Sequence, residues 1–222
     1  KIAKEAGTLP EMLRPHGYRN YMVGKWHVTS LTESGPTGPF DGWPLGRGFD
    51  RFYGFMDAET DQYSPELVRD NTPIEQPTSY APGYHLTTDL VDQSIRYLAE
   101  HMADAPETPW LLWLAPGACH APHQAPQDII KPYDAVFEGG WDVERERRLA
   151  RQKALGVVPP DTRLPPRNDG VAAWDDLPQD ARTVATRLQS AFAGMLDHTD
   201  RELARLVKFL EETGVRDDTL IL

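Results

Sequence analysis

The sequence is poor in cysteine and in positive charge, and it has no long apolar run. Cys119 is the one cysteine among 222 residues, which excludes an internal disulfide and a multi-cysteine metal site. Lys and Arg total 23 against 34 Asp and Glu, a formal net charge of -11 that disfavours nucleic acid as a partner. A membrane span needs about 18 consecutive apolar residues, and no run approaches that length. We therefore expect neither nucleic acid nor a membrane as a partner.

The sequence also lacks an initiator methionine and a recognisable signal peptide at Lys1. At its other end it stops within the strand-like run "TLIL". We expect that both ends are cut and that the chain is an internal fragment, which leaves the compartment open between cytoplasm and periplasm or secretion. The composition, 40% hydrophobic and 26% charged, is typical of a soluble globular protein.

The hydrophobic patterns alternate between strand and helix. Helices are predicted over residues 8–17, 87–102 and 182–213, with a capping box at Thr8 and Glu11 and with Thr87 or Thr88 as the cap of the second helix. Strands are predicted over 18–24, over 110–115, where the continuous apolar run indicates burial on both faces, and in "RDDTLIL". This order favours an α/β fold, a mixed, mostly parallel sheet flanked by helices.

Three segments are expected to be irregular. Glycine and proline dominate residues 35–54, and "GFDRFYGF" is interpreted as a loop pinned by aromatic side chains. Residues 60–82 are polar and interrupted by proline, which indicates a long excursion. Residues 134–180 are predicted to be a partly helical surface insertion, and residues 1–222 to be the central part of one larger domain.

Cationic side chains follow two of the predicted strands. "VGKWHVTS" places Lys25 and His27 after the first, and "LLWLAPGACHAPHQAP" places His120 and His123 after the second. Ligand groups gather beyond the carboxyl ends of strands in α/β sheets, so the two clusters are expected at one rim. A lysine that holds an anionic oxygen and a histidine that protonates a leaving oxygen would suit a sulfate or phosphate ester.

Other interpretations of the same residues remain open. The histidines of both loops are also compatible with solvated loop positions or with a zinc site made of His27, His120 and His123, although the spacing is not diagnostic. Cys119 is a conceivable thiol nucleophile, but a small buried or half-buried residue fits better. Trp26 is interpreted as a packing residue. The remaining histidines are interpreted as structural or exposed: His16, His85, His101 and His198.

Several segments together resemble the formylglycine-dependent (type I) sulfatases of the alkaline-phosphatase-like superfamily. They are "GYRNYMVGKWH", "GRGFDRFYGF", "WLLWLAPGACHAPHQAP" and "LARLVKFLEETGVRDDTLIL", in that order. "ETDQYSPELVRDN" and "YHLTTDL" resemble the bacterial arylsulfatase branch. The resemblance implies hydrolysis of a small-molecule sulfate ester by a formylglycine hydrate, with calcium or magnesium as the cofactor.

The resemblance also implies roles for individual residues. Lys25 matches the lysine that contacts the sulfate and the formylglycine, His27 the histidine that assists proton removal from the sulfated hydrate, and His120 the histidine at the leaving-group oxygen. His123 is given at most a role on the substrate side. From these assignments we expect Lys25→Ala and His120→Ala to depress turnover strongly and His101→Ala to be nearly neutral.

The departures from the family pattern are as informative as the matches. The signature Cys-x-Pro-x-Arg is absent, because Cys119 is followed by His120, Ala121 and Pro122. The paired metal-binding aspartates, the Ser-Asp-Asn-Gly segment and the lysine beyond it are absent as well. The nucleophile and metal ligands are therefore expected outside this chain, which by itself would be inactive. The alternatives are a phosphodiesterase or phosphonate monoester hydrolase of the same superfamily and a non-catalytic anion-binding protein.

Overall fold

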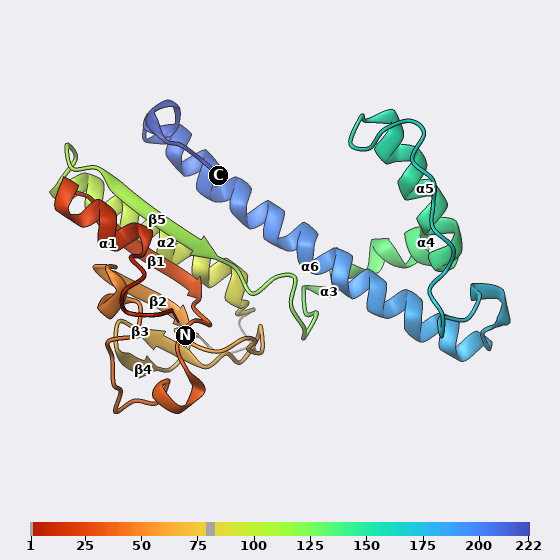
Figure 1. Ribbon diagram of the computed structural model, residues 1–222, viewed down its shortest axis with the longest axis horizontal. Helices are drawn as coiled ribbons and strands as arrows, with labels where there is room; N and C mark the ends of the chain where they lie inside the picture. Colours follow the sequence, from red (N-terminus) through yellow and green to blue (C-terminus); the bar gives the residue numbers. More distant parts are fainter. Residues whose placement is uncertain (1, 79–82) are drawn as a thin grey trace. The chain divides into compact units, whose positions relative to one another are not determined.

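The computed structural model describes residues 2–78 and 83–222 (Figure 1). Its strands are β1 (Arg19–Lys25), β2 (Arg51–Phe55), β3 (Leu67–Arg69), β4 (Thr72–Ile74) and β5 (Trp110–Ala115). Its α-helices are α1 (Leu9–Leu13), α2 (Leu86–Asp104), α3 (Gln127–Ile130), α4 (Asp134–Phe137), α5 (Gly140–Ala154) and α6 (Gln179–Glu212). None of the described helices combines the length and the apolar character that crossing a membrane requires.

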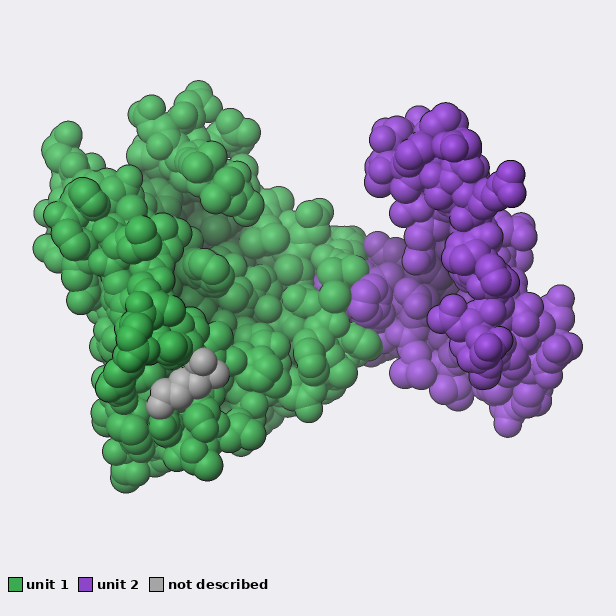
Figure 2. Space-filling model, viewed as in Figure 1, with its two compact units in different colours: residues 1–124, 196–222 green, residues 125–195 purple. Residues whose placement is uncertain are grey.

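The chain divides into two compact units (Figure 2). Unit 1 comprises Lys1–Gln124 and Leu196–Leu222, and unit 2 comprises Ala125–Met195. Residues 134–180, the predicted insertion, fall within unit 2 and contain α4 and α5. The helical content matches the expectation for this segment, while its status as an insertion stays a prediction.

The sheet of unit 1 has five strands in the order β4-β3-β2-β1-β5. β1 pairs in parallel with both β2 and β5, whereas β2 with β3 and β3 with β4 pair antiparallel. The arrowheads of β1 and β5 point the same way in Figure 1. The predicted α/β fold with a mixed sheet is therefore confirmed, and the carboxyl ends of β1, β2 and β5 share one edge.

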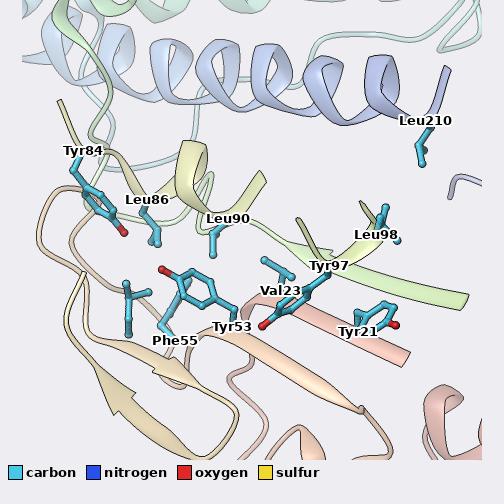
Figure 3. Packing of buried hydrophobic residues seen from close by; sticks show 11 residues of the cluster. Tyr21, Val23, Tyr53, Phe55, Tyr84, Leu86, Leu90, Tyr97, Leu98 and Leu210 are labelled. Carbon is cyan, nitrogen blue, oxygen red and sulfur yellow. The ribbon is translucent and has the colours of Figure 1, made fainter. Parts of the chain in front are cut away.

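Both faces of this sheet are covered within unit 1. On one face, side chains of β1 and β2 pack against α2 and against Leu210 near the end of α6 (Figure 3). On the other face, Met22 and Phe52 pack with Trp43 and Phe49 from the long connection between β1 and β2. Burial of these apolar side chains is the main stabilising contribution to the unit.

The strand at 51–55 corrects the prediction of a loop in "GFDRFYGF". Phe52 faces one core cluster while Tyr53 and Phe55 face the other, so the segment has the alternation of a strand that is buried on both sides. The flanking glycines hid this pattern in the sequence, but Gly54 is required there. A Cβ at Gly54 would lie 2.0 Å from the carbonyl oxygen of Gly24 on β1.

Three other expectations need correction. The predicted excursion at 60–82 contains β3 and β4, and its residues 79–82 lie outside the described part. Helix α2 is capped by His85, whose ring accepts a hydrogen bond from the Thr87 N–H, and not by a threonine. Residues 219–222 form no strand, and Leu220 is 81% exposed, because no neighbouring strand of the described chain pairs with them.

The strand at 110–115 forms as predicted but is not buried on both faces. β5 is an edge strand that pairs with β1 alone, and Trp113 on it is 50% exposed. An apolar run predicts burial only if layers cover both sides of the strand, which is a property of the whole sheet.

Candidate active site

Lys25 and His27 lie where β1 ends. Lys25 is the last residue of the strand and is paired with Phe55 of β2. The pairing continues beyond it, because the Trp26 N–H donates to the Phe55 carbonyl at 3.0 Å and the His27 N–H to the Met56 carbonyl at 3.1 Å. His27 then turns the chain with φ of +50° and exposes its side chain. The cation and the imidazole are thus held at the carboxyl edge of the sheet.

Gly24 explains why a glycine precedes this pair. It has φ of +106°, and a Cβ there would lie 2.0 Å from the carbonyl oxygen of Ala115 on β5. Only glycine combines this backbone conformation with so close an approach of the two strands. The register between β1 and β5 is therefore fixed one residue before Lys25.

Trp26 is a packing residue, as predicted. Its indole N–H donates to the Thr29 hydroxyl at 2.8 Å and to the Gly42 carbonyl at 3.1 Å. Its ring meets that of Phe49 edge to face, with centroids 6.0 Å apart. These contacts turn the indole away from solvent and anchor the chain between Lys25 and His27.

His120 lies on the loop that follows β5, at the same edge of the sheet. Its N–H donates to the Gly117 carbonyl at 3.0 Å, which closes the turn after the strand. Its ring nitrogen Nδ1 lies 2.9 Å from the Ala121 carbonyl and 3.2 Å from a carboxylate oxygen of Glu59. The side chain is about half exposed, at 48%. The imidazole is therefore oriented through Nδ1 and open to solvent.

His123 is partly buried on the same loop. Its Nε2 lies 3.2 Å from the carbonyl of Cys119, which ties the ring back to the turn. Cys119 itself is exposed, contrary to the expected burial, because it occupies the turn between Gly117 and His120 and packs into neither core cluster.

A network of polar side chains joins the loop after β5 to the loop after β2. The side-chain amide of Gln124 accepts from the Gln62 N–H at 2.8 Å and donates to the Asp61 carboxylate at 2.7 Å. Asp61 also accepts from the N–H groups of Tyr63 and Ser64, each at 2.8 Å. Burial alone would raise the pKa of Asp61, but these hydrogen bonds outweigh it and lower the pKa.

Sequence reasoning missed four polar residues of this rim: Glu59, Asp61, Gln62 and Gln124. All four residues follow β2 or β5. The residues after β2 were not selected because β2 was interpreted as a loop. Once residues 51–55 are recognised as a strand parallel to β1, the polar run "DAETDQ" after it becomes a segment of the same rim.

His85 connects this network to α2. Its Nδ1 accepts from the Thr87 N–H and its Nε2 donates to the Gln124 carbonyl, both at 3.2 Å, so the ring is neutral with its proton on Nε2. Burial and the neighbouring His198 ring, 4.4 Å away between centroids, lower the pKa of His85 to about 4. The interpretation of His85 and His198 as structural is confirmed, since both are buried.

Possible metal ligands are not clustered in the described part of the chain. Among the described residues, no group of three or more His, Cys, Asp or Glu side chains is arranged to hold a metal ion. The zinc alternative with His27, His120 and His123 therefore has no support from the geometry. The described residues also do not fit a calcium or magnesium ion by themselves.

Unit 2 contains a cavity of its own, of about 510 Å³. Its lining includes Trp174, Arg182 and Arg187 on or near α6. Arg187 is paired with Asp134 at 3.2 Å, and Arg182 donates to backbone carbonyls, so the positive charges there have partners within the unit. None of the residues lining this cavity is one of the predicted site residues.

Comparison with known proteins decides the family. The family model described as Sulfatase matches residues 1–222, the whole chain. The chain belongs to the sulfatase family. Among curated relatives of this sulfatase chain, an uncharacterized sulfatase of Schizosaccharomyces pombe is 28% identical over 97% of the chain and 39% of the relative. An arylsulfatase of Klebsiella aerogenes is 27% identical over 100% of the chain and 47% of the relative.

Solved structures support the fold of this sulfatase chain. A protein solved in complex with its substrate D-glucosamine-2-N,6-O-disulfate matches with a TM-score of 0.59 at 17% identity, covering 99% of the chain and 49% of that protein. A Bacteroides thetaiotaomicron protein from a glycosaminoglycan locus matches with a TM-score of 0.63 at 12% identity, covering 97% and 40%. The sulfatase chain spans less than half the length of the relatives it matches.

Proposed function

We propose that the polypeptide carrying these residues is an arylsulfatase-like hydrolase of sulfate monoesters. We call this polypeptide, with its flanking sequence, the parent protein. The observation that carries the proposal is the placement of the Lys-x-His and His-x-Pro segments at the carboxyl ends of adjacent parallel strands, in a chain of the sulfatase family. The substrate is a small molecule with a sulfate ester, and its alcohol part is left open.

The chemistry follows from the charges at this edge. The Lys25 ammonium would bind a non-bridging sulfate oxygen as a point charge. The Nε2 of protonated His120 would give its proton to the bridging oxygen as the S–O bond breaks, so that the product leaves as a neutral alcohol. His27 would take a proton from the sulfated hydrate when sulfate is released, and His123 would have at most a role on the substrate side.

The attacking group is proposed to be a formylglycine hydrate supplied by the flanking sequence, together with calcium or magnesium. The described residues hold neither a Cys-x-Pro-x-Arg signature nor a set of metal ligands. The sequence upstream of Lys1 therefore tests this part directly. A Cys-x-Pro-x-Arg segment there, or its serine form, supports the proposal, and its absence favours a non-catalytic anion-binding protein.

The activity is tested on the parent protein with two substrates that share one leaving group. Hydrolysis of 4-nitrophenyl sulfate and of bis(4-nitrophenyl) phosphate is measured under the same conditions. We expect kcat/KM for the sulfate monoester to be higher by about tenfold or more, a difference of at least about 1.4 kcal/mol in transition-state stabilisation. Preference for the phosphodiester would overturn the proposal in favour of the phosphodiesterase alternative. Turnover of neither substrate would overturn it in favour of anion binding without catalysis.

A further inference from the structure

Glu59 and His120 form an ion pair at the proposed site. Glu59 follows β2 and His120 follows β5, and these are the two strands that flank β1. The carboxylate oxygen of Glu59 lies 3.2 Å from Nδ1 of His120. The contact therefore joins the two loops on either side of the strand that ends in Lys25.

The partners of the ring fix its tautomer. Nδ1 of His120 faces the Glu59 carboxylate and the Ala121 carbonyl, and both of these groups only accept hydrogen bonds. The proton of the neutral ring must therefore lie on Nδ1. This leaves Nε2 as the nitrogen that gains and gives the second proton, and it directs that nitrogen away from the carboxylate.

We propose that Glu59 is a positioning residue for His120, holding the imidazole so that Nε2 delivers its proton to the leaving oxygen. This inference rests on the proposed function and adds a residue to it. Before the transfer, the carboxylate lies beside the positive imidazolium. During the transfer the proton moves from Nε2 to the bridging oxygen while the S–O bond breaks, and the ring returns to its neutral form with the remaining proton on Nδ1, hydrogen-bonded to the Ala121 carbonyl and 3.2 Å from the Glu59 carboxylate.

The two loops are anchored close to both members of the pair. Gln124, four residues after His120, is hydrogen-bonded to the Gln62 N–H and to Asp61, which lies two residues after Glu59. The Leu86 N–H donates to the Gln62 carbonyl at 2.7 Å, which fixes the same loop to the start of α2. The pair is exposed, so its contribution to stability is small, but the anchored loops keep the two side chains within reach of each other.

The test uses the leaving-group dependence of the parent protein and of its Glu59→Gln variant. A misplaced general acid harms esters of weakly acidic alcohols more than esters of acidic phenols, because only the former need a proton as they depart. We expect kcat/KM of Glu59→Gln to fall about tenfold or more on phenyl sulfate but less than about threefold on 4-nitrophenyl sulfate. An equal fall on both substrates, or no fall on either, would overturn the inference.

Two further variants make the result specific. Glu66→Gln removes the same charge from an exposed glutamate of the same connection and should leave both rates unchanged. His120→Ala should show a larger selective loss on phenyl sulfate than Glu59→Gln. If His120→Ala shows the selective loss and Glu59→Gln does not, the positioning role fails while the proposed function stands. If His120→Ala shows no selective loss, His120 is not the general acid, and that part of the proposed function is overturned.

Discussion

At the scale of single residues, the histidines of unit 1 differ in what their rings contact. His120 is exposed and bound through one nitrogen, whereas His101 is buried with both nitrogens occupied. Nε2 of His101 donates to the Thr108 carbonyl at 2.8 Å, and Nδ1 accepts from the Tyr21 hydroxyl at 2.9 Å. His101 therefore links the end of α2 to β1, so its replacement should act on stability, and the expectation that turnover is nearly unchanged stays a prediction.

The variant His101→Ala should destabilise the protein by about 2–3 kcal/mol, because it leaves a cavity and the buried Tyr21 hydroxyl without its partner. The free energy of unfolding from urea titration of the parent protein measures this directly. His16→Ala, at an exposed position, should change it by less than about 0.5 kcal/mol. A loss as small for His101→Ala as for His16→Ala would contradict the structural role.

The residues of the candidate site were only partly accessible to sequence reasoning. Lys25 and His120 could be selected because each follows an apolar run that ends in glycine or proline. Glu59 and Gln124 could not, since an acidic or amide residue in a polar loop has no pattern of its own. Their significance comes from contacts between the loop after β2 and the loop after β5, which only the folded structure shows.

At the scale of secondary structure, strands and helices with uninterrupted patterns were predicted well. β1, β5, α2 and α6 lie within a few residues of their expected ranges, because their apolar positions recur with the period of the element. β2 was missed because Gly54 interrupts its alternation, and the reason for that glycine is the backbone of the neighbouring strand. The exposure of Trp113 on β5 likewise depends on sheet order, which the local sequence does not contain.

The close approach of β1 and β5 predicts a large effect of Gly24→Ala. The new Cβ would lie 2.0 Å from the Ala115 carbonyl oxygen at φ of +106°, so the two strands must separate. We expect a loss of about 3 kcal/mol or more in the free energy of unfolding.

A matched substitution isolates the clash from the backbone conformation. Gly17 also has a positive φ, +85°, but has nothing within 4 Å of its Cβ position. Gly17→Ala should cost about 1 kcal/mol, the strain of the left-handed conformation alone. Urea titrations of both variants that gave equal losses would show that the contact between β1 and β5 is looser than described.

The pH dependence of stability should report on His85 at the start of α2. Its pKa of about 4 lies below the ordinary value of 6.5, so the unfolded chain binds a proton in this interval that the folded chain does not. The stabilisation is complete above pH 6.5 and is lost as the pH falls from there towards 4. We expect the thermal midpoint of the parent protein to decrease between pH 7 and pH 5 partly for this reason.

The variant His85→Asn keeps a side-chain acceptor for the Thr87 N–H but cannot be protonated. Its thermal midpoint should therefore fall less between pH 7 and pH 5 than that of the unmodified protein. Differential scanning calorimetry at several pH values measures the two slopes. Parallel slopes would mean that His85 does not control this pH range.

At the scale of the whole molecule, the sulfatase chain spans less than half the length of the relatives it matches. Unit 1 contains Lys25 at the end of β1, His27 just after it, and His120 and His123 after β5, whereas unit 2 contains none of them. The flanking sequence would supply the proposed nucleophile and the ligands of the metal. The proposed function therefore requires that these side chains act on the substrate of the parent protein.

The most direct measurement is kcat/KM of the parent protein on phenyl sulfate, whose leaving group needs a proton, with Lys25→Ala and with His120→Ala. Both side chains act on charge that develops as the S–O bond breaks, so each variant should lose about 100-fold or more while unfolding at the same urea concentration as the unmodified protein. His16→Ala should stay within about twofold. If Lys25→Ala and His120→Ala both kept their rates within about threefold, the central claim would be contradicted.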